Sequence, residues 1–231
     1  MLGDRRLVVV ERIDDVLHTL ATRGMHPGES VTVGRAAELP IGHTHDARIS
    51  RLALTVTCTE DGWAFESTNR NGVLIHPWGQ PPRYAQREET TAAPRVALRI
   101  VGSIVREHWV LLEDDTRLAS ARPGRANSPG GLPGDPTHAE LEALRLLFPD
   151  LLEWPPLLTE WPPGIEQVAR ELRVTTETLM RHLDEVRNRA VALGLPPEVT
   201  IADPEYVHLL VQAGWLRPEL FPESGAPSPG H

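Results

Sequence analysis

The chain has few cysteines, no lysine and no long apolar run, and the lack of cysteines and of apolar runs each excludes a class of protein or site. Its 231 residues include one cysteine, Cys58, which excludes an internal disulfide framework and a cysteine-rich zinc site. It has no lysine, so all 23 basic residues are arginine, and its net charge is −9. No stretch approaches the ~20 apolar residues that a membrane helix requires. We therefore expect a cytoplasmic protein that makes no membrane contact.

The net negative charge of the chain also bears on whether it binds nucleic acid. Nucleic-acid-binding proteins usually display a basic surface, because contacts with phosphates supply the sequence-independent part of the affinity. Most of the excess negative charge lies in residues 137–231. The charge balance therefore argues against DNA as a partner.

Short apolar or alternating runs, separated by turn residues, fill the first half of the chain. They are residues 7–10, 16–20, 31–33, 52–58, 63–65, 73–75, 96–101 and 109–112. Short strands at this spacing predict a β-sandwich or barrel over residues 1–118. In the run 52–58 every second residue, beginning with Leu52, is expected to face the core, which makes Cys58 a small buried hydrophobe.

Two later segments lack any apolar period. Residues 119–136 are dense in proline, glycine and serine, and they cannot bury enough apolar area to offset the entropy lost on ordering. We therefore predict a flexible linker at 119–136 and place the domain boundary there. The proline-rich tail, residues 217–231, is expected to be disordered.

Between the linker and the tail the apolar period is helical, which predicts an all-α domain over residues 137–216. Thr137 can cap a first helix, with Glu140 at the capping-box position. The face of this helix is expected to comprise Leu141, Leu144, Arg145 and Phe148, with Leu147 on its flank. A last short helix is predicted over residues 204–213.

A helix, a tight turn and another helix are predicted in the middle of this domain. The first covers residues 164–172 and the second begins near Thr176. The apolar stripe of the second comprises Leu179, Leu183, Val186 and Ala190. This order is the outline of a helix-turn-helix.

Residues suited to binding an anion stand in order between the predicted strands. Gly34-Arg35 comes first, then Ile49-Ser50-Arg51, then Asn71-Gly72-Val73. A guanidinium offers a planar fork of donors to phosphate oxygens, a hydroxyl adds a short donor, and a carboxamide can donate to and accept from a peptide backbone. These groups suit a binding site rather than a reaction centre.

This pattern resembles a divergent forkhead-associated (FHA) domain, a module that binds phosphothreonine peptides, and the resemblance covers about residues 7–118. It implies that Arg35 and Ser50 contact the phosphate and that Asn71 holds the peptide backbone. Arg51 stands where the family often adds positive charge. The chain departs from the family at Ala53, where a bracing histidine is usual, and at Arg70, where a threonine is common.

Each of these residues also has a purely structural interpretation. Arg35 can pair with Asp46 or Glu66, and Asn71-Gly72 is an ordinary hairpin-turn signal. The segment His43-x-His45-Asp46 has too few ligands at suitable spacing for a metal site. No nucleophile elbow, glycine-rich phosphate loop or carboxylate pair indicates an enzyme, and no cofactor is expected.

The predicted helix-turn-helix leaves two interpretations open. Thr176, Arg181 and Arg187 are candidates for DNA contact, since the second helix of such a motif enters the major groove. Acidic side chains on or beside the same face, such as Glu177 and Asp184, would repel phosphate. DNA binding and protein docking therefore stand as equal alternatives.

Taken together, these patterns predict an α+β protein of two domains, an all-β FHA-like sandwich followed by a small all-α domain. The expected function is a phosphothreonine-dependent adaptor in bacterial signalling, with a partner phosphorylated by a Ser/Thr kinase and a possible link to transcription. One alternative is a DNA-binding regulator whose sandwich only dimerises or regulates. The other is a degenerate FHA scaffold that binds an unmodified protein.

Overall fold

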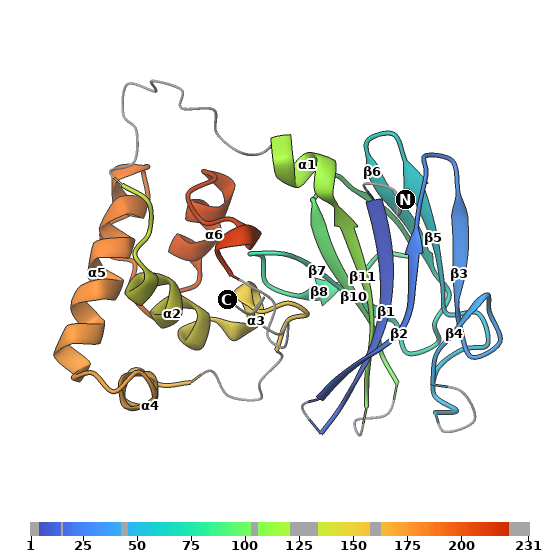
Figure 1. The fold of residues 1–231 in the computed structure, drawn as a ribbon, viewed down its shortest axis with the longest axis horizontal. Helices are drawn as coiled ribbons and strands as arrows, with labels where there is room; N and C mark the ends of the chain where they lie inside the picture. Colours follow the sequence, from blue (N-terminus) through green and yellow to red (C-terminus); the bar gives the residue numbers. More distant parts are fainter. Residues whose placement is uncertain are drawn as a thin grey trace, which may run out of the picture. The chain divides into compact units, whose positions relative to one another are not determined.

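The chain forms two compact units, residues Met1–Ala121 and Arg122–His231. The structure is a computed structural model that describes residues 5–14, 16–42, 46–102, 106–120, 134–157 and 163–221 (Figure 1). Among these residues the first unit is built from strands with one short helix, and the second unit is helical. No described helix is long and apolar enough to cross a bilayer.

The first unit is a β-sandwich. Its strands are β1 (Arg5–Ile13), β2 (Val16–Gly24), β3 (Ser30–Gly34), β4 (Leu39–Pro40), β5 (Leu54–Thr59), β6 (Gly62–Ser67), β7 (Val73–Pro77), β8 (Arg83–Tyr84), β9 (Glu88–Thr91), β10 (Arg95–Ile100) and β11 (Glu107–Asp114). One sheet has the order β2-β1-β11-β10-β7-β8 and the other has the order β4-β3-β5-β6-β9. Figure 1 shows the two sheets lying face to face.

The core of the sandwich lies between the sheets and follows from the alternation of apolar residues along the strands. Leu7 and Val9 of β1 are fully buried, as are Val31 and Val33 of β3. Each run predicted from the sequence overlaps a strand. The strands that were not predicted, β4, β8 and β9, are short and mostly exposed, so they carry no apolar period.

The predicted alternation around β5 is wrong at its first two residues. Val56 and Cys58 are fully buried as expected, but Leu52 is 44 % exposed and Ala53 is fully buried. The chain bends at residues 51–52 and β5 begins only at Leu54, so the two-residue period does not extend back into the bend.

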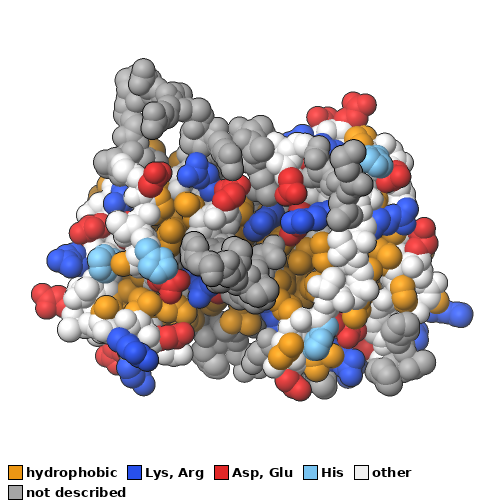
Figure 2. Space-filling view, in the orientation of Figure 1, with side chains coloured by type: hydrophobic (Ala, Val, Ile, Leu, Met, Phe, Trp, Pro, Cys, Tyr) orange, Lys and Arg blue, Asp and Glu red, His pale blue; other side chains and the backbone are white. Residues whose placement is uncertain are grey.

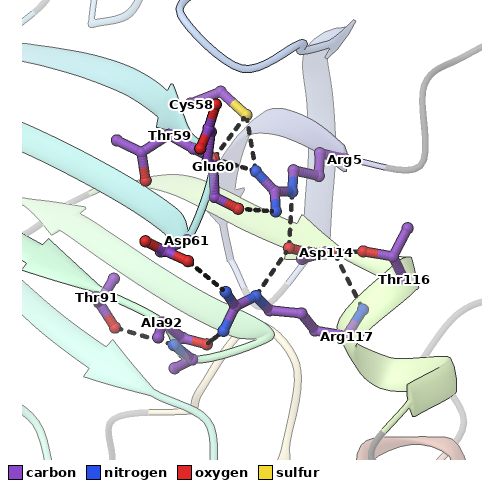
Figure 3. Close-up of polar contacts among 11 residues, drawn as sticks. Arg5, Cys58, Thr59, Glu60, Asp61, Thr91, Ala92, Asp114, Thr116 and Arg117 are labelled. Atoms are coloured by element: carbon purple, nitrogen blue, oxygen red, sulfur yellow. Dashed lines mark hydrogen bonds and ion pairs between the residues drawn. The ribbon is translucent and has the colours of Figure 1, made fainter.

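A buried ion pair joins the first strand to the last at one end of the sandwich (Figure 3). Arg5 Nε lies 2.7 Å from Asp114 Oδ2, and the Asp114 side chain is fully buried. Asp114 also accepts the backbone N–H of Arg117 at 3.1 Å, at the start of α1 (Asp115–Ser120). This helix extends into the predicted linker, of which residues 121–133 lie outside the described part of the chain.

His76 on β7 gives the sandwich a pH dependence. Burial lowers the pKa of its imidazole from 6.5 to about 4. Between these values the unfolded chain binds a proton that the folded chain does not, so stability is lost as the pH falls through this window. The full loss is about 3 kcal/mol. Chemical denaturation from pH 7 to pH 5 should show the decline, and His76→Phe should reduce its slope; an unchanged slope would contradict this account.

The second unit packs short helices around one long one. They are α2 (His138–Leu147), α3 (Pro149–Leu152), α4 (Ile165–Glu171), α5 (Thr176–Ala192), α6 (Glu205–Gln212) and the 3₁₀ helix η1 (Pro218–Leu220). The predicted stripe of α5 is confirmed, since all of its members are buried. The capping box of Thr137 and Glu140 is also confirmed, and Glu140 accepts a hydrogen bond from Arg189 at 2.6 Å.

Two predictions for this unit are corrected. The buried face of α2 contains Ala143, Leu144 and Leu147, so Leu147 lies within the face and Leu141 lies at its edge. The disordered tail cannot begin at residue 217, because Phe221 is buried and its N–H donates to Pro218 O. An aromatic residue next to prolines packs against the unit instead. Residues 222–231 lie outside the described part.

Candidate functional site

The residues predicted to contact a phosphopeptide lie on three loops that hydrogen bonds join. Arg35 follows β3, Ser50 precedes β5, and Asn71 lies between β6 and β7. The backbone N–H of Arg35 donates to Ser50 O at 3.1 Å, and that of Arg70 donates to Ser50 Oγ at 2.9 Å. The Asn71 side chain donates to Arg48 O at 2.9 Å. The structure therefore brings these groups to one rim of the sandwich.

Gly34 allows the first two loops to approach closely. A Cβ at this position would lie 2.5 Å from Arg51 O and 2.8 Å from Ala53 N. Both contacts are with backbone, which cannot rotate away as a flexible side chain does. The glycine before Arg35 is therefore required by the close packing of β3 against the loop that carries Ser50.

The guanidinium of Arg35 points along the same loop. Its Nε donates to Ile49 O at 2.5 Å, while no described carboxylate lies within ion-pair distance of it. The alternative partners are engaged elsewhere, since Glu66 lies 3.6 Å from Arg87 and Asp46 faces His108. The terminal nitrogens of Arg35 thus have no partner among the described residues and are available to an anion.

Asn69 is the residue that sequence reasoning missed. It is 7 % exposed, and its side chain accepts the N–H of Ser50 and donates to Gly72 O and Val101 O, all within 3.0 Å. It ties the Ser50 loop to the Asn71 loop and to the end of β10. Asn71, two residues further on, precedes a glycine and therefore gives a turn signal, whereas no local pattern marks Asn69.

A second group holds the Ser50 loop from beneath. His108 on β11 is fully buried, with Nδ1 3.1 Å from Glu11 Oε1 and Nε2 3.5 Å from Asp46 Oδ2. Asp46 accepts the N–H of Arg48 at 3.1 Å, so it fixes the start of the loop. Burial lowers the pKa of the His108 imidazole, and the carboxylates of Glu11 and Asp46 oppose that shift.

This arrangement bears on the missing histidine at position 53. Ala53 lies fully buried beneath the loop, and its N–H donates to Val33 O. Position 53 offers only a methyl group, but Asn69, from the loop between β6 and β7, holds the Ser50 loop by a hydrogen bond, and His108 of β11 faces Asp46 at its start. The loop therefore has supports other than the residue that the FHA pattern would place at position 53.

Of the segment His43-x-His45-Asp46, which was considered as a metal site, the structure describes only Asp46. His43 and His45 lie outside the described residues, and Asp46 is directed toward His108. Within the described ranges no group of three or more histidine, cysteine or acidic side chains is arranged to hold a metal ion.

The candidates for DNA contact lie on α5. Thr176 and Arg181 are exposed, but Arg187 is half-buried, 3.3 Å from Asp184 and with a hydrogen bond to Val199 O. A shallow depression of about 710 Å³ on this helix is lined by Glu177, Thr178, Met180, Arg181, Asp184, Glu185 and Asn188. Figure 2 shows basic and acidic side chains interspersed over the helical unit. DNA contact by α5 stays a prediction.

Comparison with solved structures returns FHA domains, matched to about half of this chain. The FHA domain of the CT664 protein from Chlamydia trachomatis is 18 % identical, with a TM-score of 0.35, and the match covers 47 % of this chain and 97 % of that one. The N-terminal FHA domain of S. cerevisiae Rad53p, solved with a phosphothreonine peptide, is 11 % identical, with a TM-score of 0.36, and the match covers 49 % and 97 %.

An FHA domain of Mycobacterium tuberculosis Rv1747 is 18 % identical, with a TM-score of 0.27, and covers 46 % of this chain and 97 % of its own. No family model and no curated protein matches the sequence. Because these TM-scores lie below 0.5, the function proposed below depends on the geometry of the rim and not on these similarities.

Proposed function

We propose that the β-sandwich is a noncovalent binding module that captures a phosphothreonine-bearing protein at the rim formed by Arg35, Ser50 and Asn71, with Arg51 and Arg70 beside them. The observation that carries this proposal is the hydrogen-bonded junction of the three loops. These hydrogen bonds join the loops that carry a guanidinium, a hydroxyl and a carboxamide, and a phosphate ester next to a peptide backbone needs these donors.

Each group has a defined role in this proposal. Arg35 directs its terminal nitrogens to phosphate oxygens. Ser50 Oγ already accepts from the N–H of Arg70, so its own proton is available to donate to phosphate. Asn71 holds the backbone of the bound peptide, and the nearby arginines neutralise the charge of the phosphate.

The second unit makes the chain an adaptor in this proposal. A binding module tethered to a second module raises the local concentration of one partner near the other. The phosphorylated partner would be a substrate of a Ser/Thr kinase. Acidic residues share the exposed face of α5 with Arg181, so no specific observation favours DNA over protein as the ligand of this unit.

The test is a fluorescence-anisotropy titration of the full chain with a phosphothreonine peptide library and its unphosphorylated twin. We expect preference for the phosphorylated set, and Arg35→Ala or Ser50→Ala should reduce it about 10- to 150-fold, since each removes a charge-assisted hydrogen bond. Arg87→Ala, in an exposed pair with Glu66, is the matched control and should change nothing. Equal binding of both sets, unaltered by Ser50→Ala, would instead support a scaffold for unmodified protein.

A further inference from the structure

The rim holds more positive charge than one phosphate needs. Arg35, Arg48, Arg51 and Arg70, here called the arginine rim, lie on the joined loops, and all but Arg35 are exposed. None of them makes an ion pair with a carboxylate among the residues that the structure describes.

Nine other arginines of the same unit are paired with acids. They are Arg5, Arg6, Arg12, Arg23, Arg83, Arg87, Arg99, Arg106 and Arg117. The four guanidiniums of the arginine rim differ from these nine, because they lie on the loops that carry Ser50 and Asn71 and have no carboxylate partner among the described residues. Asp46, the acid nearest to Arg48 along the chain, is 3 % exposed and faces His108, so it leaves the surface charge of the rim uncompensated.

The charge of the ligand follows from this surplus. Guanidinium groups stay protonated at neutral pH, whereas a phosphate monoester carries about −1.5 to −2 charges. One phosphate therefore neutralises about half of the arginine rim. Further anionic groups on the ligand would meet exposed guanidiniums that have no carboxylate partner among the described residues.

We infer that the preferred ligand of the arginine rim is a phosphothreonine peptide with acidic residues beside the phosphothreonine, an inference that rests on the proposed function. Arg35 and Ser50 hold the phosphate, and the positive charge of Arg48, Arg51 and Arg70 that the phosphate leaves unneutralised selects the acidic flanks. Charge at the flanks also speeds association, because a concentrated positive surface steers an anionic peptide toward it.

The experiment titrates the full chain with four fluorescent peptides of one core sequence. Two carry phosphothreonine, one with neutral flanks and one with a pair of glutamates on each side, and two are their unphosphorylated twins. We expect the acidic phosphopeptide to bind about three- to tenfold more tightly than the neutral one at low salt, with little difference at high salt, as for exposed ion pairs.

Two matched variants test whether the arginine rim causes the preference for acidic flanks. Arg48→Gln should lower the ratio of the two affinities, while Arg87→Gln, which removes the same charge outside the rim, should preserve it. Equal affinities for the two phosphopeptides, or equal effects of the two variants, would overturn the inference and leave the proposed function intact. Failure of either phosphopeptide to bind better than its unphosphorylated twin would overturn the proposed function itself.

Discussion

Asn69→Ala is expected to lower the free energy of unfolding of the sandwich by about 3 to 5 kcal/mol. The substitution removes the buried amide of Asn69, so the N–H of Ser50 and the carbonyl of Val101 lose this partner, while Gly72 O keeps the N–H of Val101 at 3.2 Å. Each buried polar group left without a hydrogen bond costs about 1 to 3 kcal/mol. Urea denaturation of the full chain, followed by tryptophan fluorescence, measures the change.

Asn71→Ala is the matched control two residues away. Asn71 is exposed and makes one hydrogen bond to Arg48 O, so its loss should change stability by less than about 1 kcal/mol. It should instead weaken phosphopeptide binding about tenfold, because it removes contacts with the peptide backbone. The assignment of roles would be wrong if Asn71→Ala destabilised the fold as much as Asn69→Ala does.

Arg5→Met is the second variant with a large expected effect, a loss of about 3 to 5 kcal/mol in stability. It leaves the fully buried carboxylate of Asp114 with Arg117 as its remaining counter-ion, at 3.5 Å (Figure 3). It also removes a hydrogen bond from Arg5 to Glu60 O, at 2.8 Å. A buried charge that loses its partner is far more costly than an exposed one.

The double variant Arg5→Met/Asp114→Asn separates charge from packing. Asparagine keeps an oxygen that can accept the N–H of Arg117 but removes the buried charge that Arg5 no longer neutralises. We expect it to recover most of the stability lost in the single variant, whereas Arg87→Ala, from an exposed pair, should cost less than about 1 kcal/mol. A double variant no more stable than Arg5→Met would show that the charge of Asp114 is not the cause.

The parts of the fold that were predictable are those governed by local periods. Alternation along the strands and the spacing of Leu179, Leu183, Val186 and Ala190 both reflect neighbours on the same element. The capping box of Thr137 and Glu140 is likewise contained within one turn of helix. Such features depend on residues a few positions apart, which a sequence displays directly.

The supports of the candidate site were not predictable in this way. Asn69 contacts Val101 and His108 contacts Asp46, and these pairs are far apart along the chain. These contacts depend on the order of the strands in the two sheets. No local period in the sequence encodes that strand order. Leu52 is exposed and Ala53 is buried, the reverse of the prediction, for a related reason. A bend in the loop ends the two-residue period before the strand begins.

The central claim is that Arg35, Ser50 and Asn71 act together on one phosphate-bearing peptide. Heteronuclear NMR of the labelled full chain measures this most directly, as a phosphothreonine peptide is added. We expect the backbone amide signals of these residues and of Arg70 to move together along one binding curve, and the unmodified peptide to leave them in place. Signals that move on α5 while those of the rim stay unchanged would contradict it.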